Sequence, residues 1–152
     1  MAHDFKNYPE LTNNQMNIYY FVSPHKQITE DFEAIVTKVK DGDTISVRTD
    51  FRDFDFAVRL AETAAPEMNE EGGQASRQWL EDRILNETVT ILVDKNNRVG
   101  KWGRILGQII LMGVNMNKQL INNGFATSWD DIHRNSLENF SIDIKRMEKL
   151  WR

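Results

Sequence analysis

The stretch from residue 32 to residue 61 constrains the fold more than any other part of the chain. Two strand-forming segments, Phe32–Lys40 and Thr44–Arg48, flank the turn Asp41-Gly42-Asp43, and the segment Phe54–Ala61 alternates apolar and polar residues. β-branched runs joined by an Asp-Gly turn favour a β-hairpin. Alternation with a period of two favours a strand with one buried face. This stretch therefore predicts three sequential strands.

The remaining pattern adds two strands and three helices. A helix is predicted over Gln74–Leu85, where apolar residues fall at helical spacing after Gly72-Gly73. Thr88–Val93 and Ile105–Leu111 are typical of strands, Met116–Asn123 of a short helix closed by Gly124, and Ser136–Trp151 of a terminal amphipathic helix. The sum is five strands, with a helix between the third and the fourth.

Length and composition limit the classes of protein that fit this pattern. The chain has 152 residues and 40% apolar content, which suits one domain with a real core. It contains no cysteine, which excludes a disulfide framework, a zinc-thiolate cluster and a thiol nucleophile. The apolar run nearest the start, Ile18–Val22, is too short for a signal peptide or a membrane span. We therefore expect a cytoplasmic location and no membrane partner.

The charge is unevenly distributed along the chain. The net charge of -4 argues against a general basic coat for nucleic acid. Residues 1–34 hold five acids and two bases, and all three tyrosines lie in the same region. We divide the chain into an acidic, aromatic extension at 1–31 and a β-barrel domain at 32–152. The extension either packs on its own domain or docks a protein partner, since aromatic side chains are enriched at interfaces.

Five charged side chains lie at predicted strand ends or in the adjoining turns. They are Asp41, Asp43, Arg59, Glu67 and Arg104. Phosphoryl transfer uses this mixture, because carboxylates hold a hard cation and activate water while guanidinium groups neutralise phosphate oxygens. In a chain with 28% charged residues, the alternative is a solvated surface that holds such a set by chance.

The order and spacing of these residues resemble the staphylococcal nuclease family. The resemblance is carried by Asp41-Gly42-Asp43-Thr44, Arg59-Leu60, Ala65-Pro66-Glu67 and Lys101-Trp102-Gly103-Arg104, and it covers about residues 32–151. It implies an α+β chain built on a five-stranded OB-fold barrel with helices around it. It also implies cleavage of DNA and RNA with calcium, leaving a 3'-phosphate and a 5'-hydroxyl.

The resemblance assigns a role to each matching position. Asp43 corresponds to the principal calcium carboxylate, Asp41 to a neighbour that holds the metal shell through water, and Ala65 to a ligand through its carbonyl. Arg59 and Arg104 correspond to the pair that grips the phosphate in the transition state. Glu67 corresponds to the residue that orients or deprotonates the attacking water.

Two departures from the family pattern concern the metal and the nucleotide. The family usually has a calcium-binding aspartate at the position of Ala64, whose methyl group cannot bind a cation. Ala64 is an engineered inactivation, a recent loss, or a sign of another metal geometry, in which Glu62 could reach into the site. After Gly124, the tyrosines of the family are replaced by Ser128-Trp129-Asp130-Asp131, in which Trp129 could stack a base.

A run of bases precedes the second arginine. Lys95, Arg98, Lys101 and Arg104 lie within ten residues that hold no acid. They form either a solvated hairpin or a rim that follows the phosphate chain, so Lys95, Arg98 and Lys101 are candidate nucleic-acid contacts.

Three functions remain open on the sequence. The leading one is a calcium-dependent phosphodiesterase acting on DNA or RNA. The alternative is a noncatalytic module that the 1–31 extension docks into a larger assembly, such as a phage particle, which would make the chain a virion component. A third is a nucleic-acid binder that does not cleave.

Overall fold

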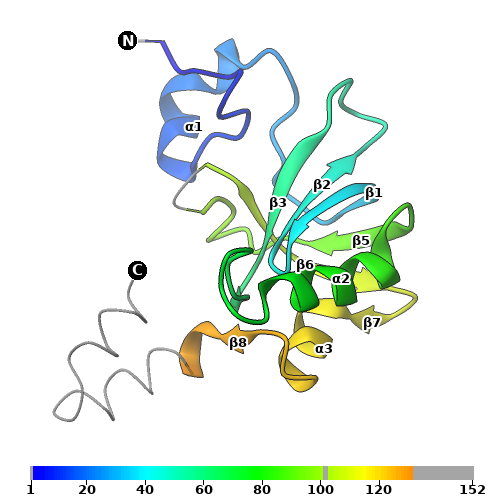
Figure 1. Cartoon of the computed structure of the whole chain (residues 1–152). Coiled ribbons are helices and arrows are strands. Elements are labelled where there is room, and N and C mark those ends of the chain that lie inside the picture. Colours follow the sequence, from blue (N-terminus) through cyan, green and yellow to red (C-terminus); the bar gives the residue numbers. More distant parts are fainter. Residues whose placement is uncertain (1, 101–102, 132–152) are drawn as a thin grey trace, which may run out of the picture.

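Five strands close into a barrel in the computed structural model, which describes residues 2–100 and 103–131. The barrel order is β3-β2-β1-β5-β6, and a parallel pairing of β3 with β6, which sets Val58 opposite Ile105, closes it (Figure 1). Its strands are β1 (Phe32–Asp41), β2 (Thr44–Arg48), β3 (Phe56–Leu60), β5 (Thr88–Leu92) and β6 (Ile105–Leu111). The predicted five-stranded OB-fold barrel with helices is confirmed.

Three two-residue strands complete the sheets. β7 (Val114–Asn115) pairs with the end of β6, whereas β4 (Thr63–Ala64) and β8 (Thr127–Ser128) pair only with each other. The β4–β8 ladder ties the loop after β3 to the segment that leads to Trp129. Pairs this short depend for their stability on the loops around them. They are also too short to give a periodic pattern in the sequence from which they could be predicted.

The helices lie around the barrel. α2 (Gly73–Ile84) packs on β1, and α3 (Met116–Asn122) packs on β6. Both agree with the predicted helices to within a residue or two, and Gly124 has the expected left-handed conformation, with φ 80°. The N-terminal region holds α1 (Asn13–Tyr19) and the 3-10 turn η1 (Tyr20–Val22). The predicted helix Ser136–Trp151 lies outside the described residues.

The turn between β1 and β2 is pressed against helix α2. A side chain at Gly42 would place its Cβ 1.9 Å from Ser76 Oγ and 2.7 Å from the Ala65 methyl carbon. Therefore only glycine fits between Asp41 and Asp43. The close approach of the turn to α2 fixes the positions of these two carboxylates.

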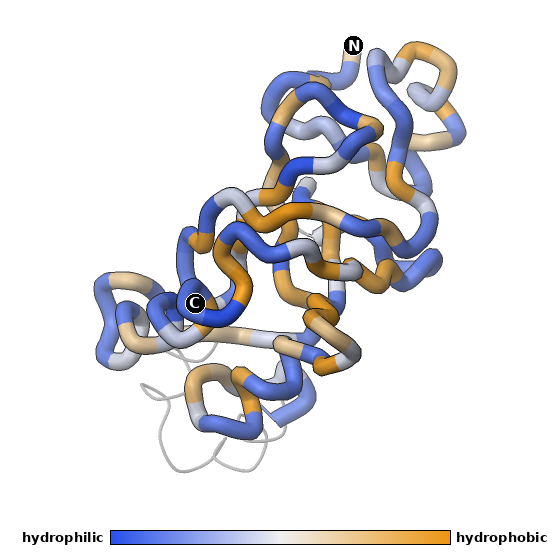
Figure 2. Tube along the Cα trace, turned by 90° about the vertical axis from the view of Figure 1, so that its right-hand side faces the viewer, coloured by the Kyte–Doolittle hydropathy of each residue, from blue (hydrophilic) through white to orange (hydrophobic). Residues whose placement is uncertain are grey.

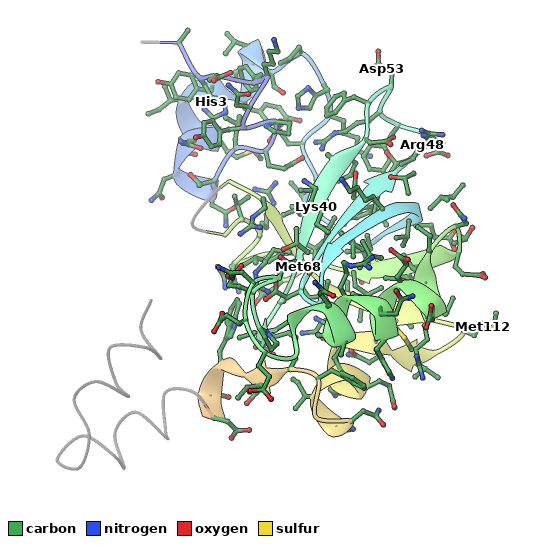
Figure 3. All side chains as sticks on the ribbon, viewed as in Figure 1. His3, Lys40, Arg48, Asp53, Met68 and Met112 are labelled. Carbon is green, nitrogen blue, oxygen red and sulfur yellow. The ribbon has the colours of Figure 1, made fainter. Side chains whose placement is uncertain are left out.

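The barrel interior is almost entirely aliphatic. Figure 2 shows many apolar stretches toward the middle of the molecule, and Figure 3 shows the side chains that the barrel strands carry. Fully buried side chains of the core are Val36, Ile45, Val47, Val58, Leu60, Leu80, Ile84, Ile91, Ile105, Ile109 and Leu120. Each such burial contributes roughly 1.5–3 kcal/mol. The core thus gives the site a rigid support.

The N-terminal extension packs on its own domain, the first of the two alternatives above. Leu11 is completely buried, and Ile28 belongs to the barrel core. The segment lies beside the β2–β3 loop, where the His25 ring is 5.1 Å from that of Phe54 (Figure 1). Its outer face still exposes apolar side chains, among them Ile18 and Phe21.

None of the helices in the described residues is both long and apolar enough to cross a bilayer.

Candidate active site

The β1–β2 turn presents the two aspartates. Asp41 Oδ1 accepts a hydrogen bond from the Asp43 amide at 3.0 Å, which orders the turn. Asp43 Oδ2 accepts from the Ala65 amide at 2.9 Å and lies 3.2 Å from Arg59 Nη2. The contact that Ala65 makes with Asp43 is therefore through its N–H, which holds the carboxylate in place.

Burial makes Asp43 a weaker acid than an ordinary, solvent-exposed aspartate. Desolvation, followed by its hydrogen bond with the Asp41 side chain, raises the pKa of Asp43 to about 6, against the opposing effects of Arg59 and the Ala65 amide. The ion pair with Arg59 thus offsets only part of the effect of burial and of the neighbouring Asp41. A bound cation would favour the ionised form of Asp43.

Arg59 is held by the protein on several sides. It lies in β3, with 17% of its side chain exposed, and Nη1 donates to the carbonyls of Leu60 at 2.8 Å and Thr63 at 2.6 Å. Burial lowers the pKa of Arg59, and Asp43 raises it again. The guanidinium also lies over the Trp129 ring, 5.8 Å from its centroid. Arg59 is accordingly fixed in direction before any ligand arrives.

Arg104 is the less constrained arginine. It directly precedes β6, and Nη1 donates to Thr44 Oγ1 at 3.2 Å. Within the described residues it forms no ion pair. Its remaining donors are therefore available to an anion.

Glu67 lies in the loop between β4 and α2. Its amide donates to Glu70 Oε1 at 3.1 Å, and its carbonyl accepts from the Glu70 amide at 2.9 Å, so the loop is internally braced. The residue is exposed, and its negative charge acts on Arg59. The Glu67 carboxylate is thus exposed to solvent and close enough to Arg59 to interact with its charge.

One pocket brings the predicted residues together. It has a volume of about 370 Å³ and is lined by Asp41, Asp43, Thr44, Arg59, Glu67, Gly100, Arg104, Leu106 and Trp129. All three predicted catalytic residues and both predicted metal aspartates lie around it. A ligand bound in this pocket would contact carboxylates and guanidinium groups at the same time.

The fit of a metal ion can be judged from the donors present. The described residues contain no group of three or more metal-ligating side chains. Ala64 lies in β4, opposite Thr127, and its methyl side chain supplies no donor atom. Glu62 lines a different pocket, with Lys118 and Asp130, so the suggestion that it replaces the missing aspartate is not supported. Asp41 and Asp43 fit a hard cation held weakly, with its other ligands from water and phosphate.

The predicted basic rim is corrected at Arg98. Only 3% of this residue is exposed, because its guanidinium donates to Glu10 Oε2 at 3.0 Å and to the Leu11 carbonyl at 3.0 Å. Burial lowers the pKa of Arg98, which Glu10 opposes. Arg98 thus ties the N-terminal segment to the barrel instead of contacting a phosphate chain. Lys95 is exposed, and Lys101 lies outside the described residues.

Two threonines at or near the site received no predicted role, although Thr44 belongs to the motif Asp41-Gly42-Asp43-Thr44. Thr44 Oγ1 donates to Asp43 Oδ1 at 3.1 Å and accepts from Arg104, so it links Asp43 to the second arginine. The Thr63 carbonyl accepts from both Arg59 Nη1 and Trp129 Nε1. Thr44 follows the Asp-Gly-Asp turn directly, which is the one signal that could have identified it.

A larger pocket lies away from these residues. Its volume is about 630 Å³, and it is lined mainly by apolar atoms between β1 and the β2–β3 loop, with Phe32, Ile35 and Phe51 among them. Its lining holds four acids but a single arginine, Arg48, which pairs with Asp55. Size alone would thus point to the wrong place, and the donor chemistry identifies the smaller pocket as the candidate active site.

Comparisons with known proteins agree with this geometry. The family model described as Staphylococcal nuclease homologue matches residues 57–150. An "Uncharacterized endonuclease" of Escherichia coli is 30% identical over 134 residues, covering 86% of this chain and 84% of that protein. A "Micrococcal nuclease" of Shigella flexneri is 34% identical over 79 residues, covering 52% of this chain and 42% of that protein. With the barrel and the pocket, these matches show that the chain belongs to the staphylococcal nuclease family.

Proposed function

We propose that this protein is a phosphodiesterase that hydrolyses DNA or RNA with the help of calcium. The proposal rests mainly on one observation. Arg59 and Arg104 line the same pocket as Asp41, Asp43 and Glu67. The nuclease names of its relatives support the substrate class.

Each residue has a task in this reaction. Arg104, which has no ion-pair partner among the described residues, binds the phosphate, and Arg59 stabilises the charge that develops in the transition state. Glu67 accepts a proton from the attacking water, and Trp129 flanks the nucleotide. Calcium, held by Asp41 and Asp43, would supply further positive charge at the phosphate oxygens.

Because Ala64 occupies the position of a calcium-binding aspartate in the family, we expect this protein to bind calcium weakly. Two aspartates are few ligands for an ion that takes six to eight oxygens, so we expect a high calcium requirement. Ala64→Asp should lower the calcium concentration for half-maximal cleavage by about tenfold or more, because an additional carboxylate ligand contributes of the order of 1–2 kcal/mol. Calorimetric titration of calcium measures the same change without activity.

The decisive experiment is a cleavage assay on plasmid, single-stranded DNA and RNA, with calcium or with chelator. Calcium-dependent products that disappear in Glu67→Gln support the proposal. Absence of cleavage in the wild type and in Ala64→Asp would refute the enzymatic function.

The missing third ligand favours one other function, binding of nucleic acid without cleavage. In that case the protein would bind a labelled single strand with steep salt dependence and leave it intact.

A docking role for the N-terminal segment, in a phage particle or another assembly, is better tested by Phe21→Ser than by deletion. Phe21 is 97% exposed, whereas deletion would remove the buried Leu11 and Ile28.

A further inference from the structure

The N-terminal segment forms one wall of a second pocket beside the candidate active site. This pocket has a volume of about 190 Å³. The segment contributes Lys6, Asn7, Pro9 and Glu10, and the barrel contributes Phe54–Ala57 and Gly103–Ile105. Arg104 lines both this pocket and the candidate active site, so the two pockets share this residue.

The charged groups of this second pocket that lack an ion-pair partner are positive. Glu10 is 2% exposed and bonded to Arg52 and Arg98, and Asp55 pairs with Arg48 Nε at 3.0 Å. Within the described part of the chain, the Lys6 ammonium has no hydrogen-bond acceptor or ion-pair partner. Asp4, two residues away, accepts hydrogen bonds from the amides of Lys6 and Asn7 but does not line the pocket. Lys6 and Arg104 are therefore the two cations of this lining that form no ion pair within the described residues.

The segment is fixed in this position by contacts on both sides. A Cβ at Gly103, where φ is +73°, would lie 2.8 Å from Tyr8 Cδ1, so the tyrosine ring rests on the residue that precedes Arg104. Glu10 is joined to Arg98, and the Arg98 carbonyl accepts from the Leu106 amide at 2.8 Å. The wall that carries Lys6 is thereby attached to both ends of the loop that carries Arg104.

We propose that this second pocket binds the phosphodiester next to the one that is cleaved, with Lys6 and Arg104 as its cationic contacts. The proposal rests on the proposed function, since it assumes a nucleic-acid strand in the first pocket. A strand carries one charge per nucleotide, so two adjoining cationic pockets with a shared arginine are suited to successive phosphates. The N-terminal segment is then part of the substrate-binding surface.

The test compares kcat/KM for a dinucleotide and for a ten-nucleotide single strand. Lys6→Ala should reduce the preference for the longer substrate by about 3- to 10-fold, the effect of one lost phosphate contact. The slope of log Kd against log salt for the ten-nucleotide strand should fall by about 0.7. Lys38→Ala, which removes an exposed lysine from β1, is the matched control and should leave both values unchanged.

The outcomes separate the two proposals. Cleavage by the wild type with the same length preference in Lys6→Ala and Lys6→Glu would overturn the second pocket and leave the nuclease function intact. If neither the wild type nor Ala64→Asp cleaves either substrate, the nuclease function fails. The second pocket is then decided by binding of the ten-nucleotide strand, where equal affinity of the wild type and Lys6→Glu, or no binding at all, overturns it.

Discussion

Arg104 is the residue whose loss should affect the reaction most. It lines both pockets and has no ion-pair partner in the described residues, whereas Arg59 is already occupied by carbonyls and Asp43. Arg104→Gln should lower kcat/KM by about 10³-fold, because a positioned guanidinium on phosphate contributes several kcal/mol. Cleavage kinetics measure this loss. Arg77→Gln on α2, which removes a pair with Glu81 and a contact with Gln78 outside the pocket, should change the rate less than twofold.

Asp43 should make the stability of the metal-free protein depend on pH. Its pKa is raised to about 6 from 3.8, so between these values the folded state binds more protons than the unfolded state. Stability from this group is therefore present below pH 4 and is lost as the pH rises through 6. Asp41, Arg59, Glu67 and Arg104 are the charged groups that surround it.

Urea unfolding in chelator, from pH 4 to pH 7, tests this dependence. The free energy of unfolding of the wild type, minus that of Asp43→Asn, should fall by roughly 2–3 kcal/mol across the range. A difference that stays constant with pH would show that Asp43 titrates normally.

At the scale of elements, β6 depends on one glycine where it crosses the barrel. A Cβ at Gly107 would lie 2.4 Å from Ile91 Cγ2. Gly107→Ala should lower the free energy of unfolding by about 1–3 kcal/mol through overpacking, measured by urea denaturation. Ile91→Ala removes that methyl group, so the double variant should be more stable than the sum of the two single effects predicts.

The elements also show how far the sequence could predict the fold. The five barrel strands and helices α2 and α3 were predicted, because their periods and turn residues are local signals. α1 was not predicted, although Thr12 and Gln15 form a capping box that the spacing Thr-x-x-Gln indicates. The third strand was predicted from Phe54, but β3 begins at Phe56 because Phe54 packs in the loop against His25.

At the scale of the molecule, a buried ion triad connects the N-terminal segment to the barrel. Glu10 accepts hydrogen bonds from Arg52, in the β2–β3 loop, and from Arg98, after β5. Glu10→Gln should lower the free energy of unfolding by about 3–5 kcal/mol, because it leaves two buried guanidinium groups without a counter-charge. Urea denaturation measures this loss, and Glu33→Gln, at an exposed site on β1, should change stability by less than about 0.5 kcal/mol.

The sequence by itself determined the barrel strands and most of the candidate site. Strand periods, the Asp-Gly-Asp turn and the order of the charged motifs are properties of neighbouring residues, and the structure brings Asp43, Arg59, Glu67 and Arg104 around one pocket. Only the tertiary structure decided which bases are free to meet a phosphate. Arg98 is buried by Glu10, 88 residues away, while Lys6 comes to lie beside Arg104. Burial of a charge depends on partners distant in sequence, and no local pattern records them.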